Sequence, residues 1–178
     1  MLRAKQKLVP VLAVGLAVLL AGCLISGTFV LDLKFTDADL AAHGNLYYTE
    51  VDLTDNEIWQ DHEDKLDEVQ SVGFEMWITN DGPQTTFNMY VENAGGTVYT
   101  DTASVRANTT QVVRGLTLAA DKQTHITYGS SFSYLTNINT LTKLARTGMF
   151  DFYATWTAAS TVTIDSLRVV VVISASDS

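Results

Sequence analysis

Cysteine occurs once in the 178 residues, at Cys23, so no disulfide can form within the chain. Proline occurs twice, and only Pro83 lies beyond the first ten positions. Without a cross-link, stability has to come from a packed core, a bound ion or association. The sequence also has no internal repeat, low-complexity linker or change of composition, and it therefore predicts one compact domain.

Basic residues are few, with 11 against 20 acidic residues and a net charge of −9. Three of them, Arg3, Lys5 and Lys7, precede every acidic residue. Without the first 22 residues, eight basic residues remain against twenty acidic ones, a net charge of −12. Such a surface repels phosphate backbones and anionic lipid headgroups, so nucleic acid is not an expected partner.

Catalytic motifs are missing as well. The sequence contains no Gly-x-Ser-x-Gly, no His-Glu-x-x-His and no phosphate-binding glycine loop. Its three histidines, His43, His62 and His125, lie in no recognisable motif, and the helical spacing around His62 is typical of a packed side chain. We therefore expect that the protein is not an enzyme. The alternative is an envelope hydrolase whose acid pair comes from distant strands and leaves no local motif.

The first 22 residues have the layout of an export signal. A basic stretch, 1–7, precedes an uncharged apolar stretch, 8–21, which is shorter than the roughly 20 residues of a membrane-spanning helix. The following motif, Leu20-Ala21-Gly22-Cys23, resembles the lipobox of bacterial lipoproteins. The resemblance implies that Cys23 is diacylated and becomes the N-terminus, and two acyl chains are enough for stable anchoring.

This resemblance divides the chain into three parts: a signal peptide (1–22), a lipid anchor with a short tether (23–27) and a β-sandwich domain (28–178). Leu24 and Ile25 follow the cysteine, in place of the aspartate that marks inner-membrane retention in enterobacterial lipoproteins. We expect an exported protein that contacts the membrane through its lipid anchor, at the outer membrane or cell surface rather than at the inner membrane.

Alternating apolar and polar residues predict β-strands in most of the remaining chain. The clearest segments are 29–35, 72–78, 87–91 and 150–156, and further strands are expected near 46–53, 97–100, 111–118 and 124–128. The last strand, 161–173, changes register at Asp165-Ser166, which predicts a bulge, and its apolar end is typical of a central strand. Short turns favour antiparallel pairing. The fold class is all-β: an antiparallel two-sheet sandwich, jelly-roll or immunoglobulin-like, with one or two short helices.

Two segments have helical spacing instead. Thr54 and Glu57 form a capping-box pattern, followed by apolar residues at helical intervals up to Val69. The second segment, 134–146, carries leucine and isoleucine at period three and basic residues near its end. It is expected to cross one end of the sandwich.

Acidic residues gather in the first of these predicted helices, where like-charge pairs at i,i+4 each cost about 0.2–0.5 kcal/mol. Calcium, which prefers carboxylate oxygens, would offset that repulsion. The candidate ligands are Asp61, Asp64, Asp67 and Glu68. Since the spacing lacks the glycine and the last glutamate of an EF-hand loop, a solvated acidic face is the favoured interpretation, and no other cofactor is expected.

Three aromatic residues, Trp77, Tyr90 and Tyr153, alternate with polar residues and should point away from the core. Exposed rings beside amides and carboxylates are typical of sugar-binding surfaces. The segment 162–169 also resembles the closing strand of jelly-roll carbohydrate-binding modules, which implies a glycan ligand. Large aromatic side chains are usually at least partly buried, however, and the favoured alternative is that these rings pack against a second layer such as the 134–146 helix.

The sequence therefore predicts a lipid-anchored, non-catalytic structural or interaction module of the cell envelope. The first alternative is a carbohydrate-binding surface lipoprotein that uses the three aromatic residues, and the second is the hydrolase without a motif. A glycan or another envelope protein is the expected partner.

Overall fold

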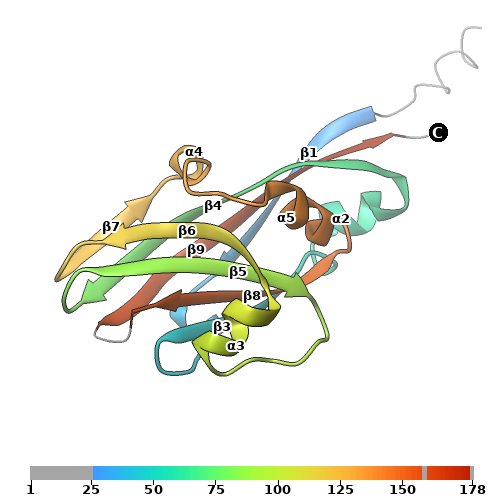
Figure 1. The fold of residues 1–178 in the computed structure, drawn as a ribbon. Coiled ribbons are helices and arrows are strands. Elements are labelled where there is room, and N and C mark those ends of the chain that lie inside the picture. Colours follow the sequence, from blue (N-terminus) through green and yellow to red (C-terminus); the bar gives the residue numbers. More distant parts are fainter. Residues whose placement is uncertain (1–25, 158–159, 177–178) are drawn as a thin grey trace, which may run out of the picture.

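The alternating segments form two antiparallel sheets that pack face to face, as seen in the computed structural model of residues 26–157 and 160–176 (Figure 1). In the described chain, a four-stranded sheet has the order β1-β9-β4-β7 and a five-stranded sheet the order β2-β3-β8-β5-β6. The first sheet contains β1 (Ser26–Phe35), β9 (Thr161–Ser176), β4 (Leu66–Asp81) and β7 (Lys122–Ile126). The second contains β2 (Ala41–Ala42), β3 (Leu46–Asp52), β8 (Met149–Trp156), β5 (Thr85–Asn93) and β6 (Thr110–Leu118).

The strand pairing is nested along the chain. β1 pairs with β9, β3 with β8, β4 with β7 and β5 with β6, all antiparallel. This nesting wraps two Greek keys around a sandwich, which is the topology of a jelly roll. The predicted two-sheet sandwich is confirmed, and its strand order is that of the jelly roll rather than of the immunoglobulin fold.

The predicted bulge in the last strand is confirmed. Trp77 of β4 pairs with Ser166 and Ile78 with Ile164, so Asp165 is the extra residue on β9. β9 lies between β1 and β4, as expected for a central strand. One predicted strand is wrong, because residues 97–100 have no regular structure and lead into a helix, α3 (Thr102–Asn108).

The helix predicted after Thr54 is shorter and begins later than expected. α2 spans Glu57–His62 and is followed by the 3-10 turn η2 (Glu63–Lys65), after which the chain enters β4. Asn56, not Thr54, is the N-cap, since its side chain accepts a hydrogen bond from the Ile58 amide at 3.0 Å. The capping-box prediction is therefore wrong. Pairing of Leu66 with β9 ends the helical run, as tertiary contacts outweigh local spacing.

The second predicted helix exists as α5 (Ile138–Ala145), and its leucines Leu141 and Leu144 are buried in the core. It contacts β4 of one sheet and β5, β6 and β8 of the other, so it crosses between the layers as expected. It begins later than residue 134 because Leu135 forms a bridge with Val113 of β6. The remaining short helical segments are α4 (Tyr128–Ser131) and η1 (Asp37–Asp39).

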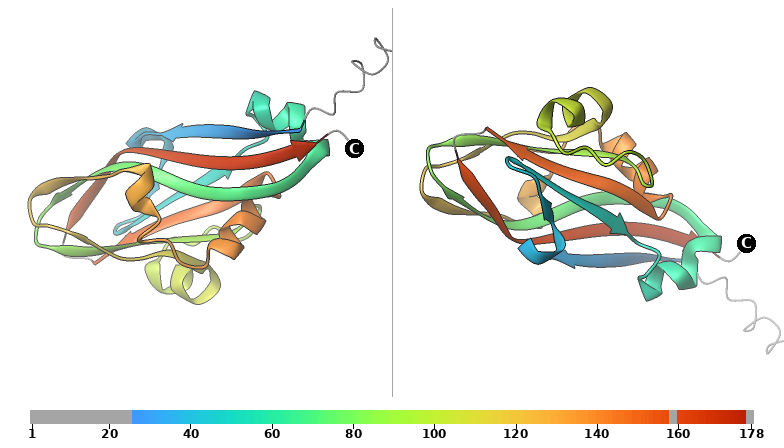
Figure 2. Two further views of the ribbon diagram at one scale, coloured as in Figure 1. Left: turned by 90° about the horizontal axis from the view of Figure 1, so that it is seen from above. Right: turned by 90° about the horizontal axis from the view of Figure 1, so that it is seen from below.

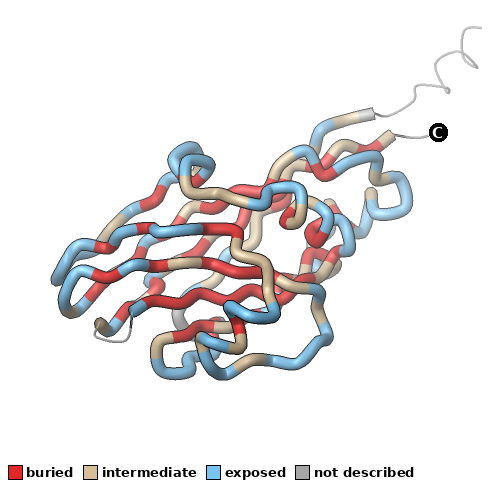
Figure 3. The backbone as a smooth tube through the Cα atoms, viewed as in Figure 1, coloured by how far each residue is buried: buried red, intermediate tan, exposed pale blue. Residues whose placement is uncertain are grey.

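The core lies between the sheets and contains residues from strands of both, and the buried stretches of these strands are red in Figure 3. The two layers are seen edge-on in Figure 2, with α3 outside the five-stranded sheet. Ser26 pairs with Ser176, so both ends of the described domain lie side by side at one end of the sandwich. Within the described residues, no helix has the length and apolar character needed to cross a membrane.

Candidate functional site

The outer face of the four-stranded sheet carries the most exposed tryptophan of the chain. Along β4, Met76 and Ile78 enter the core, and the alternation turns Trp77 to the outer face, where it is 41% exposed. The other two tryptophans, Trp59 and Trp156, are buried. The prediction that Trp77 points away from the core is confirmed, and the favoured alternative, that its ring packs against a second layer, is wrong for this residue.

His125 holds the indole of Trp77 in place. The two residues are directly opposite each other on β7 and β4. Their rings are parallel to within 3°, with centroids 3.9 Å apart. The other side of the imidazole is fixed too, since Nε2 of His125 lies 3.0 Å from Oε1 of Glu75. On β9, the residue opposite Trp77 is the small Ser166, so that strand places no ring against the indole at this position.

A row of ionisable side chains crosses all four strands beside this stack and ends at His125 on β7. We call it the charged row after Asp32, Glu75 and Arg168. Arg168 of β9 donates from Nε to Oδ1 of Asp32 on β1 at 2.7 Å, and from Nη1 to Oε2 of Glu75 on β4 at 3.3 Å. Hydrogen bonds from His125 and then Arg168 lower the pKa of Glu75, and the hydrogen bond from Arg168 lowers that of Asp32. Both carboxylates are therefore held ionised.

The bulge on β9 adds a second polar group on the other side of Trp77. Because Asp165 is the extra residue, its carboxylate reaches the outer face, where Oδ2 accepts from Thr79 Oγ1 at 2.8 Å and from Gln123 Nε2 at 3.0 Å. We call the set around Trp77 the indole face. It consists of Asp32, Glu75, Trp77, Thr79, Gln123, His125, Asp165 and Arg168.

Farther along β4, two aromatic rings lie over Gly73. A methyl group at Gly73 would come within 2.5 Å of the Tyr128 ring and 3.1 Å of the Phe132 ring. These two rings meet edge to face, with centroids 5.1 Å apart. Phe132 is 38% exposed. Spacing along the sequence does not predict this second exposed ring, because only the absence of a side chain at Gly73 makes room for it.

Tyr90 and Tyr153 do not join Trp77 in one solvent-facing patch, and this prediction is wrong. They lie opposite each other on β5 and β8, on the outer face of the five-stranded sheet, and both are buried. They pack with Val105 of α3 in a second apolar cluster that also contains Leu46. The alternative of a second layer is correct for these two residues, although that layer is α3 and not the 134–146 helix.

The same covered face contains a buried carboxylate. Asp151 of β8 is 1% exposed and lies directly opposite Glu50 of β3 and Glu92 of β5. The Tyr48 hydroxyl donates to its Oδ1 at 2.9 Å. Burial raises the pKa of Asp151, and burial with the Asp151 contact raises the pKa of Tyr48 to about 12. Since Asp151 is buried and hydrogen-bonded within the sheet, we assign this pair to the structure of the sheet.

The candidate calcium ligands are not brought together. Asp61 lies on α2, Asp64 on η2, and Asp67 and Glu68 on β4, and all four are exposed. Among the described residues, no group of three or more His, Cys, Asp or Glu side chains is placed to hold a metal. Calcium binding there stays a prediction.

Two other predicted residues have different outcomes. His62 packs against Phe29, with ring centroids 3.8 Å apart, as expected for a side chain at the edge of the core. Cys23 and the rest of the predicted lipobox lie outside the described residues, so lipidation stays a prediction.

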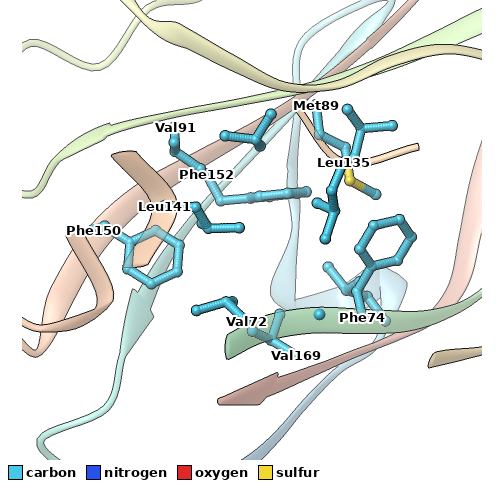
Figure 4. A pocket seen from close by; sticks show the side chains of 13 residues that line it. Val72, Phe74, Met89, Val91, Leu135, Leu141, Phe150, Phe152 and Val169 are labelled. Atoms are coloured by element: carbon cyan, nitrogen blue, oxygen red, sulfur yellow. The ribbon is translucent and has the colours of Figure 1, made fainter. Parts of the chain in front are cut away.

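The cavity that the described residues leave between the two sheets is too small for a ligand. A cavity of about 30 Å³ lies between the sheets, and apolar side chains from both layers and α5 converge on it (Figure 4). That volume would hold a water molecule or two, but an apolar lining of this kind stays dry. The outer surface is therefore the place to look for a binding site.

No protein-family model and no curated protein matches the sequence. The chain is similar to a solved structure of Desmodium yellow mottle tymovirus, with 10% sequence identity and a TM-score of 0.36. The match covers 85% of this chain and 88% of that chain. It is also similar to one of the T13 particle of IBDV, with 11% identity and a TM-score of 0.36 over 85% and 35% of the two chains. A third likeness is to latent PorU from Porphyromonas gingivalis, with 9% identity and a TM-score of 0.28 over 84% and 13%. Likenesses this low carry no argument about function.

Proposed function

We propose that this protein is a lipid-anchored module of the cell envelope that binds a partner, without catalysis, through the indole face. The observation that carries the proposal is the placement of that face along β9. Ser176 pairs with Ser26 at the end of the domain that follows the lipobox, and Ser166 pairs with Trp77 ten residues away. At about 3.3 Å per residue, Trp77 lies roughly 30 Å from the anchored end.

Charge supports the same orientation. The exposed acidic residues of α2 and η2 lie near the anchored end, because β4 begins directly after them and its Leu66 pairs with Ala175 of β9. Negative charge there would repel anionic headgroups and keep the domain from lying down on the membrane. The indole face would then be presented away from the lipid.

Binding without catalysis fits the state of the carboxylates. A general acid needs a raised pKa, but those of Glu75 and Asp32 are lowered by their partners. Asp151, with its raised pKa, is buried under Tyr48 and out of reach of a substrate.

The anchor is tested with the full chain expressed in a bacterial host. Mass spectrometry should find diacylglycerol on an N-terminal Cys23, and Cys23→Ser should move the protein from the membrane fraction to the soluble fraction. A mature N-terminus elsewhere, or a Cys23→Ser protein that stays in the membrane fraction, would overturn the proposed anchoring.

A further inference from the structure

Two exposed aromatic rings mark the ends of one strip on the four-stranded sheet. Trp77 stands on β4 itself, and Phe132 lies over Gly73 of the same strand. The four residue steps from Gly73 to Trp77 correspond to about 13 Å at roughly 3.3 Å per residue. Both rings belong to the same side of the sheet, since positions 73, 75 and 77 alternate with the core positions 74 and 76.

The strip between the rings is polar and already ordered. Glu75 lies midway, fixed by His125 on one side and Arg168 on the other. A carboxylate has about four acceptor positions and a guanidinium five N–H donors, so these groups keep hydrogen-bonding capacity for a ligand. Because they are held in place by each other, a ligand would not have to order them on binding.

We propose that the indole face and Phe132 together bind a short neutral glycan that runs along β4, with one sugar ring stacked on Trp77 and a later one against Phe132. This inference rests on the proposed function and names its ligand. A pyranose presents an apolar C–H face to an aromatic ring and hydroxyl groups at its rim, which matches rings at both ends and hydrogen-bonding groups between them. Asp165, Thr79 and Gln123 supply further polar contacts beside Trp77.

Charge and area favour this ligand over others. Asp32, Glu75 and Arg168 already pair on the face, and the chain as a whole is negative, which disfavours an anionic polysaccharide. A stable protein interface buries about 800 Å² on each partner around an apolar centre. Here a charged row separates the two exposed rings, so the strip lacks such a centre.

The test uses the full-length protein and neutral oligosaccharides, from single sugars to hexasaccharides, of the cello-, xylo-, manno-, malto- and chito- series. Binding is followed by tryptophan fluorescence, because Trp77 is exposed while Trp59 and Trp156 are buried, and by calorimetry. At least one series should bind, with affinity that rises with chain length and emission that becomes protected from acrylamide.

Variants separate the two rings. Trp77→Ala should lower affinity for every length by about tenfold or more, and Trp77→Phe should restore part of it. Phe132→Ala should lower affinity for the longer chains and leave single sugars unchanged. Val98→Ala, at a residue 44% exposed outside the indole face, is the matched control and should change nothing.

Failure of all five series to bind, or binding that survives Trp77→Ala, would overturn the glycan inference. A Phe132→Ala effect equal for short and long chains would overturn the extended site. These failures differ from failure of the proposed function, because Trp77→Ala protein should still fractionate with the membrane through Cys23. A protein partner cross-linked at Gln123 in intact cells would replace the glycan and leave the anchored binding module standing.

Discussion

Trp77 and Tyr153 both point away from the core, but on opposite outer faces of the sandwich. Trp77 leaves β4 of the four-stranded sheet and reaches solvent, whereas Tyr153 leaves β8 of the five-stranded sheet and is 0% exposed beneath α3. Its hydroxyl donates to Oε1 of Glu92 at 2.8 Å. Equal alternation in the sequence therefore produces one exposed residue and one residue buried beneath a helix.

These different environments predict different costs of truncation. Tyr153→Ala should lower the free energy of unfolding by about 3–5 kcal/mol, because it empties a buried aromatic site. Trp77→Ala should cost on the order of 1 kcal/mol, the value of its stacking on His125. Urea denaturation of both variants measures the difference. Equal losses would show that the two rings are not in the environments described.

The buried carboxylate predicts a variant more stable than the natural protein. Asp151→Asn keeps an acceptor for Tyr48 and removes the charge that faces Glu50 and Glu92, and directly opposed like charges on a sheet each cost up to about 1 kcal/mol. Asp151→Asn should therefore raise the melting temperature at neutral pH by a few degrees.

The gain should depend on pH. Since burial raises the pKa of Asp151 above its ordinary 3.8, the folded state carries a penalty for ionising it at pH values above that raised pKa. That penalty disappears as the pH falls through the raised folded value towards 3.8, so the two melting curves should converge in acid. Asp151→Ala is the control, because it removes the acceptor of the Tyr48 hydroxyl and should lower stability. A constant difference between Asp151→Asn and the natural protein at all pH values would contradict the assignment.

The charged row predicts a pH dependence opposite to that of Asp151, because ionised Glu75 stabilises the folded protein. Hydrogen bonds from His125 and Arg168 lower the pKa of Glu75 below its ordinary 4.5. The stabilisation is present above pH 4.5 and is lost as the pH falls through the lower folded value. Glu75→Gln lacks this contribution, so its melting temperature should lie below that of the natural protein at neutral pH and approach it in acid. Because the row is exposed, added salt should reduce the difference. A gap that widens in acid would contradict the ion pairs.

The sequence predicts much of the fold because alternation and turn residues are local signals. The bulge at Asp165, the central β9 and the outward direction of Trp77 all follow from spacing along one strand. Spacing does not predict that α3 covers Tyr90 and Tyr153. This helix has only seven residues and a single capping signal, the side chain of Asp101. A helix that short gains its stability from the sheet on which it packs.

Local sequence patterns do not predict the candidate site itself. Asp32, Glu75, His125 and Arg168 come from four strands spread over most of the chain, and only strand order and register bring them into one row. A period-two pattern gives the direction of each side chain and says nothing about its neighbour. The strand order of the jelly roll supplies that missing information.

Gly73 makes room for Tyr128 and Phe132, and its replacement tests their position. Gly73→Ala would place a methyl group 2.5 Å from the Tyr128 ring, closer than carbon atoms approach, so the ring and Phe132 beside it must move. Overpacking of this kind typically costs about 1–3 kcal/mol.

Gly129→Ala is the matched control on α4, where nothing lies within 4 Å of the added methyl group. Alanine in a helix should stabilise the protein by about 0.5–1 kcal/mol relative to glycine. Both substitutions add one methyl group, at Gly73 beneath the Tyr128 ring and at Gly129 next to Tyr128 in the sequence. They should change the melting temperature in opposite directions. If a glycan spans the strip, Gly73→Ala should also weaken the longer oligosaccharides as Phe132→Ala does, because it displaces the same ring. Equal melting temperatures for the two alanine variants would show that Tyr128 does not lie over Gly73.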